Sequence, residues 1–190
     1  MRIVSGRWKG KALVAPAGAA TRPTSDRARQ AVFNILEHAA WAPTMAGARV
    51  LDLFAGTGAL GLEALSRGAA HCLFVDTDPA ARAALASNIE ACSAQGISRV
   101  WKRDATDLGP MPGSANGPFD LVFLDPPYAK AFDLAALKGL QHGWLHGGSL
   151  VMLERGRGEI PLSHGGYDLI DRRTYGAAEV IFLKLLETGL

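Results

Sequence analysis

The sequence predicts an α/β fold with a mostly parallel sheet. Three observations support this prediction: apolar strand patterns alternate with helical patterns from residue 49 onward, a glycine-rich loop joins the first of these strands to a helix, and the chain ends in a β-hairpin pattern. Strands that alternate with helices are joined by right-handed crossovers into a parallel sheet. With 190 residues, 48% of them hydrophobic and 20% charged, the chain has the size and composition of one globular domain.

The expected elements follow in order along the chain. Residues 2–14 contain two short strand patterns around a glycine-containing turn, and Thr24 or Ser25 is expected to cap a helix that extends to about Ala40. Core strands are expected at 49–54, 71–76, 99–102, 119–125 and 149–154, with helices at about 58–67, 79–94 and 132–145. Residues 112–118 form a loop, and the terminal hairpin joins 167–173 to 179–186.

Composition excludes several classes of protein. No apolar run reaches membrane-spanning length, and the first residues lack the core of a signal peptide, so a cytoplasmic protein is expected. Cys72 and Cys92 form no Cys-x-x-Cys pair and are interpreted as inert, reduced thiols. His142 and His146 are four residues apart, but Gly143 weakens a helix there and no acidic third ligand is evident, so no metal site is predicted.

The net charge of +2 conceals a strong asymmetry. Residues 1–30 carry seven basic side chains and one acid, a net charge of +6, whereas the remainder carries 13 basic and 17 acidic side chains, a net charge of −4. A basic segment on a mildly acidic body is typical of polyanion binding, and an aromatic side chain lies among the cations. The candidate RNA-binding residues are Arg2, Arg7, Trp8, Lys9, Lys11, Arg22 and Arg27.

A glycine loop follows the first core strand. Gly56-Thr57-Gly58-Ala59-Leu60-Gly61 has the Gly-x-Gly-x-x-Gly spacing between a strand and a helix, and Asp76 ends the next strand, 20 residues after Gly56, where a carboxylate can accept from both ribose hydroxyls. This pattern alone fits a dinucleotide or a methyl donor. Asp52, just upstream, would repel a pyrophosphate but suits the sulfonium and ammonium of S-adenosylmethionine. Asp104, after the third strand, is placed to accept from an adenine amino group.

Asp125-Pro126-Pro127-Tyr128 is the most informative motif. It follows the apolar strand pattern 119–124, and the carboxyl ends of such strands are where open α/β sheets bind ligands. The prolines fix the backbone and remove two donors, so carbonyl oxygens and the Asp125 carboxylate can accept from an exocyclic amine. Tyr128 offers a flat ring on which a base can stack.

These motifs together resemble the RsmD family of class I S-adenosylmethionine-dependent methyltransferases. The resemblance rests on the strings Arg2–Lys11, Arg22–Arg27 and Asp52–Gly68 and on Asp125–Tyr128, and it extends over nearly the whole chain. It implies a Rossmann-like, mostly parallel seven-stranded sheet with an antiparallel last strand, plus a small N-terminal β-hairpin extension. On this reading residues 1–23 form a basic hairpin and linker, and residues 24–190 form the methyltransferase domain.

The family methylates the N2 amine of one guanine in bacterial 16S ribosomal RNA, which is the activity the resemblance implies here. The expected cofactor contacts are Asp52, Phe54, Gly56, Gly58, Asp76 and Asp104; the expected catalytic residues are Asp125, Pro126, Pro127 and Tyr128; no metal is required. The expected partner is 16S rRNA, within the small ribosomal subunit or an assembly intermediate, and the enzyme is expected to act as a monomer away from membranes.

Other activities fit the residues less well. A cytosine-C5 methyltransferase needs a nucleophilic cysteine near the site, and Cys72 begins a different strand. A nicotinamide-dependent oxidoreductase is disfavoured by Asp52, and a non-catalytic RNA-binding module leaves the glycine loop unexplained. Glutamine methyltransferases usually carry Asn in place of Asp125. Adenine-N6 methylation of DNA or RNA remains open on chemistry alone.

Overall fold

The computed structural model describes residues 1–16, 26–127, 132–157 and 165–186. The elements run in the order α1 (Asp26–His38), β1 (Arg49–Leu53), α2 (Ala59–Ser66), β2 (His71–Val75), α3 (Pro79–Ala91), η1 (Gln95–Ile97), β3 (Ser98–Trp101), η2 (Gly113–Ala115), β4 (Phe119–Leu124), α4 (Phe132–Leu140), β5 (Leu145–Gly156), β6 (Tyr167–Tyr175) and β7 (Ala178–Leu185). No helix in these ranges is long and apolar enough to cross a membrane.

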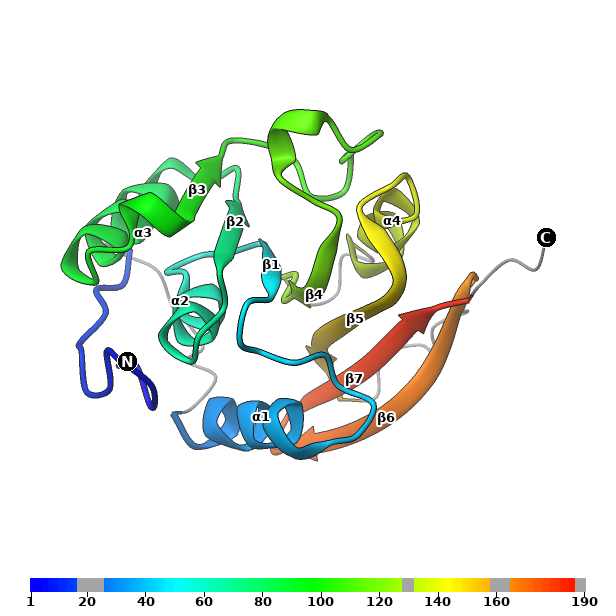
Figure 1. Ribbon diagram of the computed structural model, residues 1–190, viewed down its shortest axis with the longest axis horizontal. Coiled ribbons are helices and arrows are strands. Elements are labelled where there is room, and N and C mark those ends of the chain that lie inside the picture. The colour runs from blue at the N-terminus through cyan, green and yellow to red at the C-terminus, as the bar shows by residue number, and fades with distance from the viewer. Residues whose placement is uncertain (17–25, 128–131, 158–164, 187–190) are drawn as a thin grey trace.

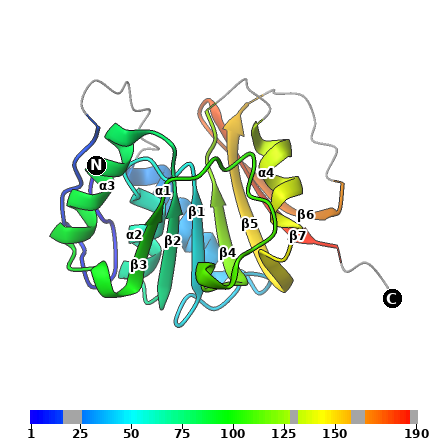
Figure 2. The same cartoon turned by 90° about the horizontal axis from the view of Figure 1, so that it is seen from above.

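The seven described strands form one sheet in the order β3-β2-β1-β4-β5-β7-β6 (Figure 1). Strands β1 to β5 pair in parallel, whereas β7 lies between β5 and β6 and is antiparallel to both. The mostly parallel sheet with an antiparallel last strand is therefore confirmed. Figure 2 shows the central strands side by side, with α4 next to β5 and with α3 next to the N-terminal segment.

The sheet is covered on both faces, as parallel sheets require. One core cluster joins α1, α2 and α3 to side chains such as Val50, Phe123 and Met152. The other joins α4 and Trp144 to the alternate side chains of the same strands, including Leu51 and Val122. Burial on both sides explains why β1 and β4 are continuous apolar runs interrupted by few polar residues.

Three elements differ most clearly from the sequence prediction. The helix predicted at 132–145 ends at Leu140, because the chain reverses through Gly143 in the left-handed conformation (φ +86°) and brings Trp144 onto Phe119, with 6.2 Å between ring centroids. Strand β5 consequently begins at Leu145 rather than at Ser149. The N-terminal strands predicted within 2–14 are reduced to an isolated antiparallel bridge between Arg2 and Ala12.

The N-terminal hairpin, residues 1–14, is docked on the body rather than extended from it (Figures 1 and 2). Glu63 of α2 is fully buried, and its carboxylate accepts from the backbone N–H of Val4 at 2.7 Å and of Ser5 at 2.9 Å. The Ser66 hydroxyl accepts from the N–H of Trp8 at 3.0 Å. The backbone approach is so close that a Cβ on Gly6 would lie 2.0 Å from the Ser66 carbonyl oxygen.

Candidate active site

Asp52 lies in β1 with only 2% of its surface exposed. The N-cap residue of α2 is Gly58, which has no side chain to accept from the free N–H groups of the first turn. Asp52 supplies the missing acceptor, because its Oδ2 accepts from the backbone N–H of Gly61 at 2.9 Å. Burial raises the pKa of the Asp52 carboxyl from 3.8 to about 8; the Gly61 hydrogen bond opposes this rise and the negative charge of Asp76 adds to it.

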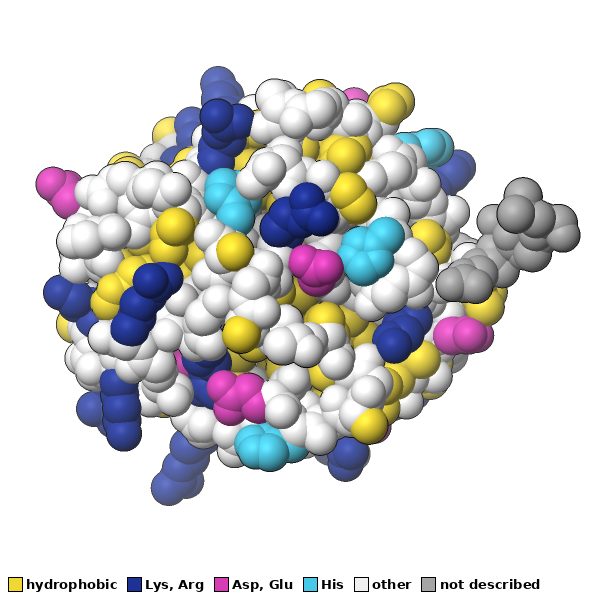
Figure 3. Space-filling view, viewed as in Figure 1, with side chains coloured by type: hydrophobic (Ala, Val, Ile, Leu, Met, Phe, Trp, Pro, Cys, Tyr) yellow, Lys and Arg dark blue, Asp and Glu magenta, His cyan; other side chains and the backbone are white. Residues whose placement is uncertain are grey.

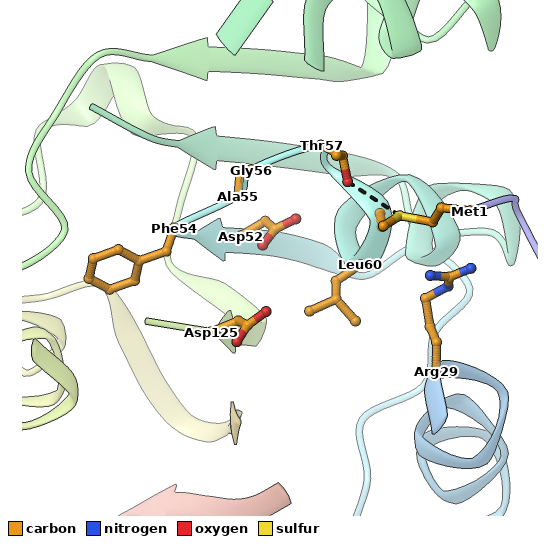
Figure 4. Close-up of a pocket in the computed structure, with 10 residues that line it drawn as sticks. Met1, Arg29, Asp52, Phe54, Ala55, Gly56, Thr57, Leu60 and Asp125 are labelled. Carbon is orange, nitrogen blue, oxygen red and sulfur yellow. Dashed lines mark hydrogen bonds between the residues drawn. The ribbon is translucent and has the colours of Figure 1, made fainter. Parts of the chain in front are cut away.

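Asp125 follows β4, the strand next to β1, and lines the same pocket as Asp52 (Figure 4). In Figure 4 both carboxylates point into the space beside Leu60. Burial raises the pKa of Asp125 well above its ordinary value, and the negative charges of Glu154 and Asp52 raise it further. Pro126 is buried and Pro127 is exposed, whereas Tyr128 lies outside the described residues.

The glycine loop and the acid that ends β2 hold each other in place. Asp76 Oδ2 accepts from the N–H of Gly56 at 2.8 Å, and Oδ1 accepts from the N–H of Asp78 at 2.8 Å. Gly56 and Gly58 have φ values of +55° and +76°, in the left-handed region that favours glycine. A Cβ on Gly58 would also lie 2.3 Å from Leu85 Cδ1, so this turn has no room for a side chain.

Two further predicted cofactor residues have local partners. Phe54 adopts a positive φ of +56°; it belongs to the pocket lining, but in Figure 4 its ring is turned away from Leu60. The ring stacks on Phe132 with 6.1 Å between centroids and 2° between planes. Asp104 is exposed, and its Oδ1 accepts from both the N–H and the hydroxyl of Thr106. Neither Asp76 nor Asp104 belongs to the lining of the Asp52–Asp125 pocket.

The structure adds pocket residues that sequence reasoning missed: Met1, Arg29, Thr57 and Leu60. Arg29 is 1% exposed; its guanidinium donates to Asp26 at 2.8 Å and to the Arg2 carbonyl oxygen, and lies 3.8 Å from Glu63. It is one of the seven basic side chains counted in residues 1–30, but its burial removes it from the surface. The sequence held one signal for a buried partner of Arg29: Glu63 is the one acid in the otherwise apolar helix pattern 59–66.

Asn88 of α3 joins the N-terminal hairpin to the glycine loop. Its Oδ1 accepts from the N–H of Val14 at 2.8 Å, and its amide donates to the carbonyl oxygens of Val14 at 3.0 Å and Thr57 at 2.9 Å. The Thr57 hydroxyl is also 3.5 Å from the sulfur of Met1 (Figure 4). The hairpin therefore begins at the pocket and is fastened to the loop that lines it.

The described cations of the predicted RNA-binding set remain at the surface. Arg2, Arg7, Lys9, Lys11 and Arg27 are exposed, and Figure 3 shows Lys and Arg side chains projecting from the edge where Figure 1 has the hairpin. Arg7 lies over the partly buried ring of Trp8, 4.3 Å from the centroid, and donates to the Leu65 carbonyl oxygen. Arg22 lies outside the described residues.

The donor set of the pocket suits a cationic ligand. Asp52 and Asp125 supply carboxylates, and the tight turns at Gly56 and Gly58 let the backbone come close to a ligand. Within the described ranges, His, Cys, Asp and Glu side chains form no group that could hold a metal ion. His146 instead pairs with Asp120, with 3.0 Å between Nε2 and Oδ1.

A parallel sheet with a glycine loop after β1 and acids at successive strand ends defines a Rossmann-like methyltransferase. Solved structures agree with this class: yhhF from Escherichia coli, described as a candidate methyltransferase, has 32% sequence identity and a TM-score of 0.80 over 97% of both chains.

The chain belongs to the RsmD family, whose model, described as conserved hypothetical protein 95, matches residues 1–184. It is 37% identical to ribosomal RNA small subunit methyltransferase D of Escherichia coli K12 over 155 residues. This aligned region covers 81% of this chain and 74% of the relative. The protein of the same name from Haemophilus influenzae is 33% identical over 182 residues, covering 93% of this chain and 89% of the relative.

Proposed function

We propose that this protein transfers a methyl group from S-adenosylmethionine to the exocyclic N2 amine of a guanine in the 16S RNA of the small ribosomal subunit. The observation that carries the proposal is the pocket shared by Asp52 and Asp125, two acids on neighbouring strands beside the glycine loop of an RsmD-family chain. Such a pocket suits both a cationic donor and an amine acceptor.

The donor side of the site is formed by strand ends and the glycine loop. S-adenosylmethionine, when bound, supplies a methyl group activated by the positive charge of its sulfonium. Asp52 faces that positive charge, Gly56 and Gly58 admit the backbone to close contact, and Asp76 accepts from the ribose hydroxyls. Phe54 and Asp104 complete the donor site beside the nucleoside, with Asp104 accepting from the adenine amine.

The acceptor side depends on the motif after β4. The nitrogen lone pair of an exocyclic amine is delocalised into the ring, which makes the amine a weak nucleophile. Asp125 and the Pro126 carbonyl accept its hydrogens, localise the lone pair and align it with the methyl group, so catalysis is positioning plus electrostatics. Asp125 then takes the released proton. Pro127 fixes the turn, and Tyr128, outside the described residues, stacks on the base.

The N-terminal hairpin is proposed to hold the RNA. The hairpin begins at the pocket with Met1 and is fastened to α2 and α3, which supports a role for its exposed cations in holding RNA at the site. Contacts from Arg2, Arg7, Trp8, Lys9, Lys11, Arg22 and Arg27 to phosphates and bases would position the substrate without reading its sequence. We further propose that the enzyme is a cytoplasmic monomer that acts on the small subunit or an assembly intermediate; the names of its relatives support a ribosomal RNA substrate.

The test is a methyl-transfer assay with labelled S-adenosylmethionine. Small ribosomal subunits, naked 16S rRNA and duplex DNA are offered in parallel, and the product is digested to nucleosides and identified by mass spectrometry. N2-methylguanosine from ribosomal material is the expected product. Methyladenine from RNA or DNA would replace the guanine assignment with the adenine-N6 alternative, and transfer to none of the three would refute nucleic-acid methylation.

A substitution tests the role of Asp125 directly. Asp125→Ala is expected to abolish turnover while the dissociation constant for S-adenosylmethionine, measured by calorimetry, changes by no more than a few-fold. Asp107→Ala, which removes an exposed carboxylate, is the matched control and should behave as wild type. Wild-type turnover in Asp125→Ala would remove this residue from the mechanism.

A further inference from the structure

Glu154 is a buried acid that the mechanism above does not use. It lies near the carboxyl end of β5 with 5% of its surface exposed, after the apolar residues 150–153. Carboxylates are rarely buried unless a specific interaction holds them. Its place near the pocket acids makes it a candidate for a role in the site.

The strand register brings Glu154 next to Asp125. Strands β4 and β5 are parallel, with Leu124 opposite Leu153, so the next residues along the two strands are Asp125 and Glu154. Neighbouring strands are roughly 5 Å apart. On the other side of β4, Asp52 of β1 lies opposite Phe123, two residues before Asp125, and so lies diagonally from Asp125.

The side chains of these acids emerge on the same face of the sheet. Phe123 and Met152, two residues before Asp125 and Glu154, both belong to the core cluster beneath α1, α2 and α3, and side chains two apart along a strand point the same way. Arg155 belongs to the opposite face, where it lies 3.8 Å from Asp133 of α4. Asp52, Asp125 and Glu154 thus lie on one face of the sheet: Glu154 is level with Asp125, and Asp52 lies two residues earlier in the register.

Two acids and one basic side chain lie near Asp125 in the described structure. Glu154 and Asp52 both raise its pKa by their negative charge, in addition to the effect of burial. Arg29 of α1 is the cation in the lining of the same pocket, and its guanidinium is engaged by Asp26 and lies near Glu63. The strand neighbour Glu154 is therefore the largest charged influence on Asp125.

We propose that Glu154, which lies next to Asp125 on the neighbouring strand, is a positioning residue that makes Asp125 an effective acceptor for the proton released from the substrate amine. This inference rests on the proposed function. When the nitrogen lone pair forms the new N–C bond, the S–C bond breaks with its electrons passing to sulfur, and the positive charge moves to nitrogen. Nitrogen then loses one proton to the Asp125 carboxylate, which leaves a neutral methylamine and a neutral Asp125 carboxyl.

Two neighbouring carboxylates retain one proton more tightly than either would alone, because like charges at this spacing disfavour full ionisation. Glu154 thus makes Asp125 a stronger base without touching the substrate. A stronger base also accepts a stronger hydrogen bond from the amine before transfer, which helps to localise the lone pair. The proton leaves the pair to solvent after the product departs, which restores the resting state.

The test compares pH–rate profiles of kcat/KM on small ribosomal subunits for wild type, Glu154→Gln and Glu154→Asp. Removing the charge should move the acidic limb of the profile to lower pH by about one unit and lower the plateau by about tenfold, whereas Glu154→Asp should keep the limb near wild type. Glu179→Gln is the matched control: Glu179 lies on β7 and pairs with Arg172 at 3.6 Å. An unchanged limb in Glu154→Gln, or an equal shift in the control, would overturn the proposal.

A measurement without turnover separates this inference from the proposed function. Carbon-13 labelling of aspartate carboxyls, with Asp125→Asn used for assignment, gives the titration of Asp125 in the resting protein. A midpoint well above the ordinary range in wild type that falls in Glu154→Gln is expected. If that variant does not fold, wild type and Glu154→Asp still decide the matter, because ordinary titration of Asp125 in wild type overturns the proposal even if methylation of rRNA is observed.

Discussion

Relative to wild type, Asp52→Asn should have a higher free energy of unfolding, and the difference should grow as the pH rises. The same substitution should weaken the affinity for S-adenosylmethionine. Asp52 is 2% exposed, and its Oδ2 accepts from the N–H of Gly61 at 2.9 Å. An asparagine oxygen can accept the same hydrogen bond in the same space. The substitution therefore removes the ionisable group and leaves the cap on α2 in place.

The magnitude follows from the pKa of Asp52, which burial raises from 3.8 to about 8. Between these values the unfolded chain has released the proton and the folded protein still holds it, so the free energy of unfolding falls as pH rises, by about 1.4 kcal/mol per pH unit. Across the whole window the loss amounts to roughly 6 kcal/mol. Asp52→Asn has no ionisable group at this site, so its free energy of unfolding does not fall with pH for this reason.

The assay is urea unfolding followed by circular dichroism from about pH 5 to about pH 8. The free energy of unfolding of Asp52→Asn minus that of wild type should grow steadily with pH, and calorimetry at about pH 8 should show at least a roughly tenfold weaker affinity for S-adenosylmethionine, because the positive donor loses a carboxylate. Asp107→Asn, at an exposed acid, should give a difference that is flat with pH. A flat difference for Asp52→Asn would refute the reasoning.

Three further predictions test how the site is held together and how it meets RNA. Gly61→Ala should lower the free energy of unfolding, measured by urea titration, by about 1–3 kcal/mol, because the new Cβ would lie 2.4 Å from Phe74 Cε1 and 2.6 Å from Cys72 Sγ. The control Gly96→Ala, whose Cβ would have nothing within 4 Å, should lower it far less. Equal losses in the two variants would contradict the steric argument. Asn88→Ala should also cost about 1–3 kcal/mol and should speed hydrogen exchange at the Val14 amide, since the hairpin and the glycine loop lose their shared partner; unchanged exchange would show that the hairpin is held elsewhere. Lys9→Ala with Lys11→Ala should reduce the slope of log affinity for RNA against log salt by about 1.4–1.8, whereas Lys138→Ala on α4 should leave it unchanged; a slope equal to wild type would separate the hairpin from RNA binding.

Much of the sheet could be predicted because its signals are local. Buried parallel strands such as β1 and β4 are apolar on both faces and stand out as short continuous runs, and a glycine loop between a strand and a helix has few alternative conformations. The helix predicted at 132–145 was too long because its end depends on a distant contact. Gly143 is a local signal for the reversal, but the burial of Trp144 against Phe119, which accompanies the end of the helix at Leu140, depends on a residue more than 20 positions away.

The sequence by itself determined the fold class, the family and the two acids at the centre of the site. Asp52 lies within one strand pattern and Asp125 follows another, and the carboxyl ends of parallel strands meet at one edge of the sheet. Only the tertiary structure decided how the hairpin docks on Glu63, that Arg29 is buried, and that Glu154 lies beside Asp125. Those facts depend on the register between strands and on the packing of helices, which are set by contacts between residues far apart in the chain.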